Sequence, residues 1–312
     1  MSDICYSPNK VDLFFPARRG EFFSTDLPDT EAGLCAEMAR LAYCRQEPHF
    51  FSADDQISQI LKRIGFTCQF FESKGSPNGR GTHCLLAVHE DSDPVKKLAV
   101  VAFRGTDSDD PTDLFDDGAL VQTEWRTGGL VHSGFADALA EVEDNLLQAL
   151  EHTACRVLIT GHSLGAATAT LLASLRRPDH LYTFGSPRVG NSEFIAALSG
   201  VKASRFVDCC DMVTRVPPAT LLLDIDYEHF GTLNYIDRNR QITLDPPEEY
   251  MREDRLKASE EYILNYGWKT GNVGVRELAD HAPINYVAAV NADLSQPRLA
   301  RWSLAASLGN SC

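Results

Sequence analysis

The stretch "RVLITGHSLGAATATLL", residues 156–172, changes its pattern abruptly at Ser163. The apolar run before the serine predicts a short buried strand, and the run of Ala and Leu from 164 to 175 predicts a helix. Gly161 and Gly165 flank the serine at a spacing that lets the backbone turn sharply and lets strand and helix pack closely. The pattern predicts a nucleophile elbow; the alternative is a tight turn in which Ser163 only caps the helix.

Composition limits what the rest of the chain can be. The 312 residues contain no Gly/Ser or Pro-rich linker and no internal repeat, so we expect a single α/β domain over 1–312. A net charge of -15 without a cluster of Lys and Arg argues against a nucleic-acid partner and against binding of anionic membranes through a basic patch. No apolar run approaches the roughly 18 residues of a membrane span.

The nine cysteines are odd in number and include no C-x-x-C pair. This spacing argues against a disulfide framework and against a zinc site, so we expect buried free thiols and no metal. The first twenty residues also lack the basic and apolar regions of a signal peptide. Together these features predict a cytoplasmic protein.

Helical and strand-like segments alternate along the chain. Predicted helices cover 30–46, about 134–151 and 248–268; predicted strands lie in "CQFFES", "HCLLAVHE", "KLAVVAFRG", "HLYTFG", "SRFVDCCD" and a hairpin over 227–244. This alternation predicts a mostly parallel central sheet with helices on both faces, and the elbow then lies at the carboxyl edge of that sheet. We expect an irregular N-terminal segment over 1–29; for the tail, 293–312, the sequence predicts neither order nor disorder.

A serine hydroxyl is a weak nucleophile at neutral pH, so Ser163 needs a histidine base that is itself oriented by a carboxylate. In hydrolases built on an elbow the chain order is serine, acid, histidine, which leaves His180, His229 and His281. His180 leads directly into a strand, with little room for an acid before it. His229 lies in the predicted hairpin, where strand pairing would fix it in the sheet, whereas His281 lies in a loop. We therefore favour His281 as the base and keep His229 as the alternative.

The acid must lie between Ser163 and His281. Asp211 stands just after the strand "SRFVDCC", where the chain leaves the carboxyl edge, and "RVPP" after it predicts a rigid loop. Asp208 would lie within that strand, and Asp224 and Asp226 would begin the hairpin. Asp211 is the preferred acid. Asp208, Asp224 and Asp226 are the alternatives, and each is otherwise an ordinary solvated or turn carboxylate.

An oxyanion hole would complete such a site. The backbone N–H of Leu164 follows the nucleophile and supplies one donor, and a loop after an earlier strand supplies the second. The loop after "LAVVAFRG" offers Thr106, with a freed backbone before it and a hydroxyl of its own. Taken without the other parts this loop is an ordinary turn, in which Arg104 would pair with a buried carboxylate.

The residues at this point resemble the class 3, or fungal-type, lipase family of α/β-hydrolases. The matching pieces follow the order of the family: "VAFRGT" at 101–106, "VHSGF" at 131–135, "GHSLGAA" at 161–167, "YTFGSPRVGN" at 182–191, "CDMVTRVPP" at 210–218, "YEHFG" at 227–231 and "DHAPINY" at 280–286. Together they extend over roughly residues 30–290, and seven ordered matches are more specific than the elbow alone.

The resemblance implies an α/β-hydrolase fold with a lid loop over the site. It implies Ser163 as nucleophile, Asp211 as acid and His281 as base, with an oxyanion hole formed by Thr106 and Leu164. It also implies hydrolysis of acylglycerols or related lipid esters, without metal or cofactor. A lipid or small ester is then the partner, with at most transient contact with a lipid surface.

Two regions bear on the substrate. The loop 107–130 lies where the family carries its lid and has six aspartates and Glu124 against Arg126, a formal charge of 1 - 7 = -6. Its apolar residues, Trp125 among them, are candidates to close over an acyl chain, and its aspartates are otherwise a solvated acidic loop or calcium ligands. The second region, the charged helix 248–268, is an insertion between acid and base.

Several departures from the family leave the substrate open. Ala166 replaces a usual glycine, and the signal peptide and disulfides of the family's secreted members are missing. Alternatives to a lipase or carboxylesterase are a phospholipase A-type enzyme, an acyltransferase with the same triad, and a catalytically silent binding protein on the same fold.

Overall fold

A computed structural model gives the fold of most of the chain. It describes the following residues: 5–16, 22–23, 28–44, 53–73, 81–93, 96–105, 121–153, 155–219, 226–293 and 295. The strands are β1 (Phe66–Glu72), β2 (His83–His89), β3 (Leu98–Phe103), β4 (Gln122–Glu124), β5 (Leu130–His132), β6 (Arg156–His162), β7 (His180–Phe184), β8 (Ala203–Asp208), β9 (Thr232–Ile236) and β10 (Ile242–Leu244).

Eight of these strands form one sheet in the order β1-β2-β3-β6-β7-β8-β9-β10. The pairs from β3 through β9 are parallel, whereas β1, β2 and β10 run antiparallel at the two edges. All of β3 and all but the first residue of β6 are buried, as expected for central strands that are covered on both faces. The predicted mostly parallel sheet is confirmed, with β6 near its centre.

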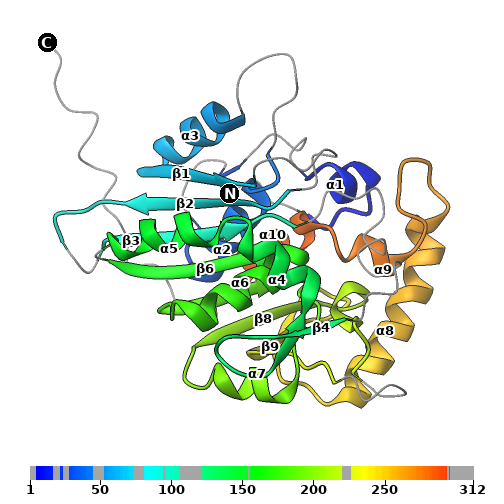
Figure 1. Cartoon of the computed structure of the whole chain (residues 1–312). Helices are drawn as coiled ribbons and strands as arrows, with labels where there is room; N and C mark the ends of the chain where they lie inside the picture. Colours follow the sequence, from blue (N-terminus) through cyan, green and yellow to red (C-terminus); the bar gives the residue numbers. More distant parts are fainter. Residues whose placement is uncertain are drawn as a thin grey trace, which may run out of the picture.

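Helices cover both faces of this sheet (Figure 1). They are α1 (Lys10–Phe14), α2 (Glu31–Leu41), α3 (Ala53–Arg63), α4 (Ser133–Ala140), α5 (Glu143–Glu151), α6 (Leu164–Leu175), α7 (Ser192–Ala197), α8 (Glu248–Tyr262), α9 (Arg276–Ala279) and α10 (Pro283–Ala292), with a 3₁₀ turn at Val213–Arg215 and a π-helical turn at Ile263–Gly267. One apolar core joins α2 and α10 to the sheet, and a second core joins α4, α5 and α6 to the opposite face.

The helix predicted for 30–46 forms as α2, but it is buried on all sides instead of on one face. The cause is α10, which packs on the outer side of α2. Buried charges on α2 are paired: the Arg40 guanidinium donates to Glu37 at 2.8 Å, and Glu31 accepts from Arg156 at 2.7 Å. Such pairing is what a buried charge requires.

Other predicted boundaries also change. The helix predicted for about 134–151 divides into α4 and α5, because the chain turns at 141–142 and buries Val142. The segment 1–29 is not wholly irregular, since it contains α1. The hairpin pairs β9 with β10, but its first strand begins at Thr232, so His229 lies before the sheet instead of in it.

The predicted lid is described only at its end. Residues 106–120 lie outside the described part of the chain, whereas 121–130 include β4 and part of its partner β5. Trp125 is 9% exposed, packs in the second core, and its indole N–H donates to Ser174 at 2.8 Å. Trp125 is therefore a core residue, and assigning it to a movable lid was wrong.

None of the helices in the described ranges has the length and apolar character needed to cross a bilayer.

Candidate active site

Ser163 occupies the corner between β6 and α6. Its backbone has φ 58° and ψ -128°, a conformation that non-glycine residues rarely adopt, and its side chain makes no capping hydrogen bond. The two flanking glycines are required by close packing. A Cβ at Gly161 would lie 2.2 Å from the carbonyl oxygen of Gly165, and a Cβ at Gly165 would lie 2.4 Å from that of Phe103. The strained serine is thus held by strand–helix packing, with its hydroxyl free for another partner.

That partner is a histidine from a distant part of the sequence. His281 Nε2 lies 3.0 Å from Ser163 Oγ, and His281 Nδ1 lies 3.0 and 2.9 Å from the two carboxylate oxygens of Asp211. Asp211 follows β8 and His281 lies in the turn between α9 and α10, so two separate connections meet the elbow. All three side chains are buried. The structure brings together the serine, acid and base that the sequence favoured.

The rival candidates lie elsewhere. His229 Nε2 donates to the carbonyl of Thr214 at 2.8 Å. The carboxylate of Asp208, at the end of β8, accepts from Arg240 at 2.5 Å, and Asp226 accepts from the backbone N–H of Ser192 at 3.3 Å. Asp224 lies outside the described residues. None of the three described rivals has a hydrogen bond to Ser163 or His281 among the contacts described.

The oxyanion donors are described only in part. Leu164 begins α6, and its backbone N–H follows the serine as predicted, whereas Thr106 lies outside the described residues. The chain leading to Thr106 does pass close to the elbow. A Cβ at Gly105 would lie 2.1 Å from the hydroxyl of Tyr43 and 2.8 Å from the carbonyl oxygen of His162. The guanidinium of Arg104 donates to the carbonyls of Gly81 and Gly105.

Tyr286 is a member of the site that the sequence reasoning missed. Its hydroxyl donates to Asp211 Oδ2 at 2.6 Å and accepts from the backbone N–H of Asp208 at 3.1 Å. The other oxygen of Asp211 accepts from the backbone N–H of Val213 at 2.9 Å. Burial raises the pKa of the Tyr286 phenol well above its usual range, so this hydroxyl stays a donor. Nothing in the spacing of "HAPINY" distinguishes it from a core tyrosine.

Tyr286→Phe tests this contact. The variant keeps the ring but removes one hydrogen bond to a carboxylate, an interaction of about 1.5–3 kcal/mol. We expect kcat on a dissolved ester to fall roughly tenfold because Asp211 is then held less firmly. Steady-state kinetics and a thermal melt provide the measurement. An unchanged kcat in a folded variant would show that Tyr286 only packs in the core.

His162 holds the base from the other side. Its Nε2 donates to the carbonyl of His281 at 2.8 Å, and its Nδ1 accepts from the hydroxyl of Tyr43 at 2.7 Å. Burial, followed by the proximity of His281, lowers the pKa of His162 well below its ordinary value. The imidazole is therefore neutral and serves as a fixed support for the turn that carries His281.

A second buried histidine links stability to pH. Burial, followed by the charges of Arg205 and Arg188, lowers the pKa of His229 well below its usual value. The folded state keeps His229 neutral, but the unfolded chain binds a proton below about pH 6.5, so this group destabilises the fold as the pH falls. Desolvation raises the pKa of Asp208 to about 7, so this group stabilises the fold as the pH falls. The two effects oppose each other, and the pH dependence of the wild-type stability alone therefore cannot test the state of His229.

His229→Gln isolates the histidine. Between pH 7.5 and 5.5 we expect the wild type to lose about 1.4 kcal/mol more free energy of unfolding than the variant. Urea denaturation at both pH values measures the difference. Identical pH dependence in the two proteins would mean that His229 takes up its proton in the folded state over the same pH range as in the unfolded chain.

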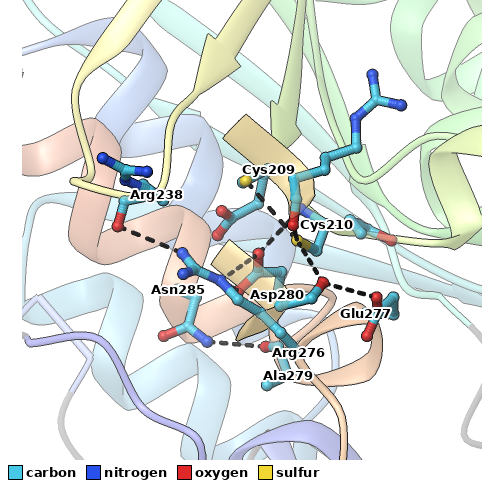
Figure 2. Close-up of polar contacts among 12 residues, drawn as sticks. Cys209, Cys210, Arg238, Arg276, Glu277, Ala279, Asp280 and Asn285 are labelled. Carbon is cyan, nitrogen blue, oxygen red and sulfur yellow. Dashed lines mark hydrogen bonds and ion pairs between the residues drawn. The ribbon is translucent and has the colours of Figure 1, made fainter. Parts of the chain in front are cut away.

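Asp280 ties the acid loop to the base turn (Figure 2). Its carboxylate accepts from the backbone N–H of Cys210 at 3.0 Å, from the hydroxyl of Tyr6 at 2.8 Å and from Arg276 Nε at 3.1 and 3.2 Å. Cys210 directly precedes Asp211, and Asp280 directly precedes His281. One fully buried carboxylate thus sets the spacing of acid and base.

The thiols of Cys209 and Cys210 lie with Asp280 in the one group of metal-ligand side chains that the described residues bring together. Both oxygens of Asp280 already accept hydrogen bonds from the Arg276 guanidinium, and Cys209 Sγ donates to Asp254 Oδ2 at 3.2 Å. A cation here would displace a buried ion pair and meet the charge of Arg276. We therefore regard this group as a structural network.

The comparisons with known proteins agree with this geometry. Residues 100–221 match the family model described as lipase (class 3). A lipase from Rhizomucor miehei is 37% identical over 167 residues, which cover 48% of this chain and 44% of the relative. A secreted mono- and diacylglycerol lipase, MDL3, from Malassezia globosa is 35% identical over 205 residues, which cover 59% of this chain and 62% of the relative.

Among solved structures, the crystal structure of mono- and diacylglycerol lipase from Aspergillus oryzae aligns with a TM-score of 0.54 at 25% identity. The alignment covers 68% of this chain and 84% of that one. The chain spans less than two thirds of the length of the curated relatives that it matches. Sheet order, elbow and family match agree: residues 100–221 match the class 3 lipase family, and the sheet resembles that of a lipase with an α/β-hydrolase fold.

Proposed function

We propose that this chain is a serine ester hydrolase that cleaves acylglycerols or related lipid esters through an acyl-enzyme intermediate. The observation that carries the proposal is the hydrogen-bonded chain from Ser163 Oγ through the imidazole of His281 to Asp211. Acylglycerol as the substrate class is drawn from the names of the relatives from Malassezia and Aspergillus.

The chemistry follows from the orientation of the three groups. His281 Nε2 takes the proton of Ser163 as its oxygen attacks the ester carbonyl, and Asp211 stabilises the imidazolium that forms. The negative charge on the carbonyl oxygen is stabilised by the N–H of Leu164 and by Thr106, the second proposed donor. His281 then protonates the leaving alcohol, and a water molecule activated by the same imidazole releases the acid.

A fluorophosphonate probe tests the proposal directly. The probe reacts with an activated serine, so we expect one label at Ser163 in the wild type and none in Ser163→Ala. A panel of dissolved and dispersed esters of rising chain length then identifies the substrate class. An unlabelled, folded wild type would support the alternative of a silent binding protein. Transfer of the acyl group to an added alcohol in preference to water would identify an acyltransferase.

Cytoplasmic localisation stays a proposal. It is supported by five buried thiols among the described residues, Cys35, Cys44, Cys84, Cys209 and Cys210, as is usual in a reducing compartment. The relative from Malassezia is named as secreted, which points the other way. Fractionation of the source cells, with detection of the untagged chain in cell extract and medium, decides between the two.

A further inference from the structure

Apolar and aromatic side chains protrude from the end of α8. Leu264 is 75% exposed and Trp268 is 73% exposed, and Ile263 and Tyr266 beside them are also exposed. The π-helical turn that carries most of them contains no buried residue. Large exposed apolar side chains that stand singly need no explanation, but a contiguous group of them marks an interaction site.

This turn is firmly supported by its neighbours. The hydroxyl of Tyr262 donates to the carbonyl of Val273 at 2.7 Å, which closes the loop beneath the exposed side chains. The N-terminal segment adds further bonds, from the N–H of Lys10 to the carbonyl of Gly271 at 2.9 Å and from the N–H of Val273 to the carbonyl of Pro8 at 2.8 Å.

These bonds place α1 next to the turn, where Val11 and Phe15 are exposed as well. We name the six side chains together the tip surface: Val11, Phe15, Ile263, Leu264, Tyr266 and Trp268.

The charge of the tip surface differs from that of the rest of the molecule. No acidic residue lies between Tyr262 and Val275, in a chain with a net charge of -15, whereas α8 just before carries six acidic and three basic residues. Lys269 Nζ lies 5.2 Å from the ring centroid of Tyr266 and 5.7 Å from that of Trp268. A group of Trp, Tyr, Lys and aliphatic side chains suits the boundary between water and lipid, where rings and lysine stems are buried and the ammonium stays hydrated.

The tip surface is joined through a short segment to the turn that carries His281. Val275 is followed by α9, which leads into the turn of His281. Figure 1 shows the loop between α8 and α9 at the same end of the molecule as α1 and α9. A stable interface between proteins takes about 20–30 residues on each side. Six side chains fall well short of that number, but they suffice for reversible attachment to a lipid layer.

We propose that the tip surface docks this chain onto a zwitterionic lipid surface and thereby presents the site to esters in that surface. This inference rests on the proposed function for its purpose but is tested by binding alone. A zwitterionic surface has no net charge, so attachment is driven by burial of the apolar tip side chains, and the segment 263–275 contains no carboxylate that would have to be desolvated at the contact.

The test uses the full chain with Ser163→Ala, so that no lipid is hydrolysed. Cosedimentation with phosphatidylcholine vesicles gives the partition coefficient, and intrinsic fluorescence reports a blue shift as Trp268 leaves water. We expect the additional changes Leu264→Ser and Trp268→Ser together to lower the partition coefficient at least about tenfold. Leu264→Ser alone keeps Trp268 as the reporter, and we expect it to need more lipid than the parent for the same blue shift. The matched control is Leu256→Ser, an exposed leucine of α8 outside the tip surface, which should change the coefficient less than about twofold.

Three results would overturn the proposal: no binding of vesicles by the parent, equal loss in the Leu256→Ser control, or a dimer that the tip substitutions dissociate while vesicle binding persists. Thermal melts confirm that the variants are folded. In the chain with Ser163 intact, the ratio of turnover on dispersed ester to turnover on dissolved ester should fall with the tip substitutions. Tip-dependent vesicle binding without any hydrolysis would refute the proposed function and leave the docking surface standing.

Discussion

Ser163→Ala is expected to reduce turnover of a dissolved aryl ester by about 10⁶ in kcat, by analogy with the same removal in an unrelated serine hydrolase. The reason is that His281 and Asp211 act only through the serine oxygen, so the remaining residues have no group to activate. Stability should change little, because alanine meets the same backbone strain at φ 58° and the hydroxyl makes no helix cap.

The measurement compares wild type and variant at equal concentration, with circular dichroism and a thermal melt to establish folding. Fluorophosphonate labelling of the same samples shows whether another nucleophile is present. Residual turnover well above background in a folded Ser163→Ala protein would exclude the elbow serine as nucleophile.

Asp211→Asn is expected to lower kcat by about 10⁴ while leaving the fold intact. An asparagine presents an amide where His281 Nδ1–H needs an acceptor, so the imidazole turns or takes the wrong tautomer. Steady-state kinetics on the same dissolved ester measure the loss. Asp226→Asn is the matched control, because Asp226 was a rival acid and its carboxylate accepts a 3.3 Å bond from the backbone N–H of Ser192. A loss of only a few fold at Asp211 would assign the orienting role to another carboxylate.

The parts of the site that follow from the sequence are those set by local pattern or by chain order. The elbow is local, since Gly161, Ser163 and Gly165 lie within five residues. The strand before it and the helix after it are each predicted by the pattern of their apolar residues. Acid and base follow because each lies at the end of a predicted element on the carboxyl side of the sheet. Order along the chain then excludes most of the other histidines.

The supporting residues could not be predicted in this way. Tyr43 meets His162, and Tyr286 meets Asp211, across more than seventy positions of sequence. Their side chains are typical of any buried helix or strand, so only the packed structure distinguishes a positioning contact from core filling. Asp280 lies in the matching piece "DHAPINY", but its contacts with Cys210 and Arg276 become visible only in the packed structure, so the sequence predicts no role for it.

Two errors have a physical explanation. His229 was placed in a strand because "YEHFGTLNYI" is rich in strand-forming residues, but Gly231 has φ 94° and the ladder begins only after it. Trp125 was placed in a lid because the loop 107–130 lies where the class 3 lipases carry one and the side chain is apolar. Its own ring is buried against the second core, and composition averaged over a loop does not reveal where one side chain points.

The two ends of the segment between Asp211 and His281 are joined to each other. The chain leaves the site at Met212 and returns at Glu277, where the N–H of Met212 donates to the carbonyl of Glu277 at 3.2 Å. Because this bond closes the segment next to the site, and loop-closure entropy grows only slowly with length, we expect a change in the length of the outer portion 263–275 to cost little stability. A different turn grafted between Tyr262 and Arg276 should therefore change the surface of the protein and leave the positions of Asp211 and His281 as they are.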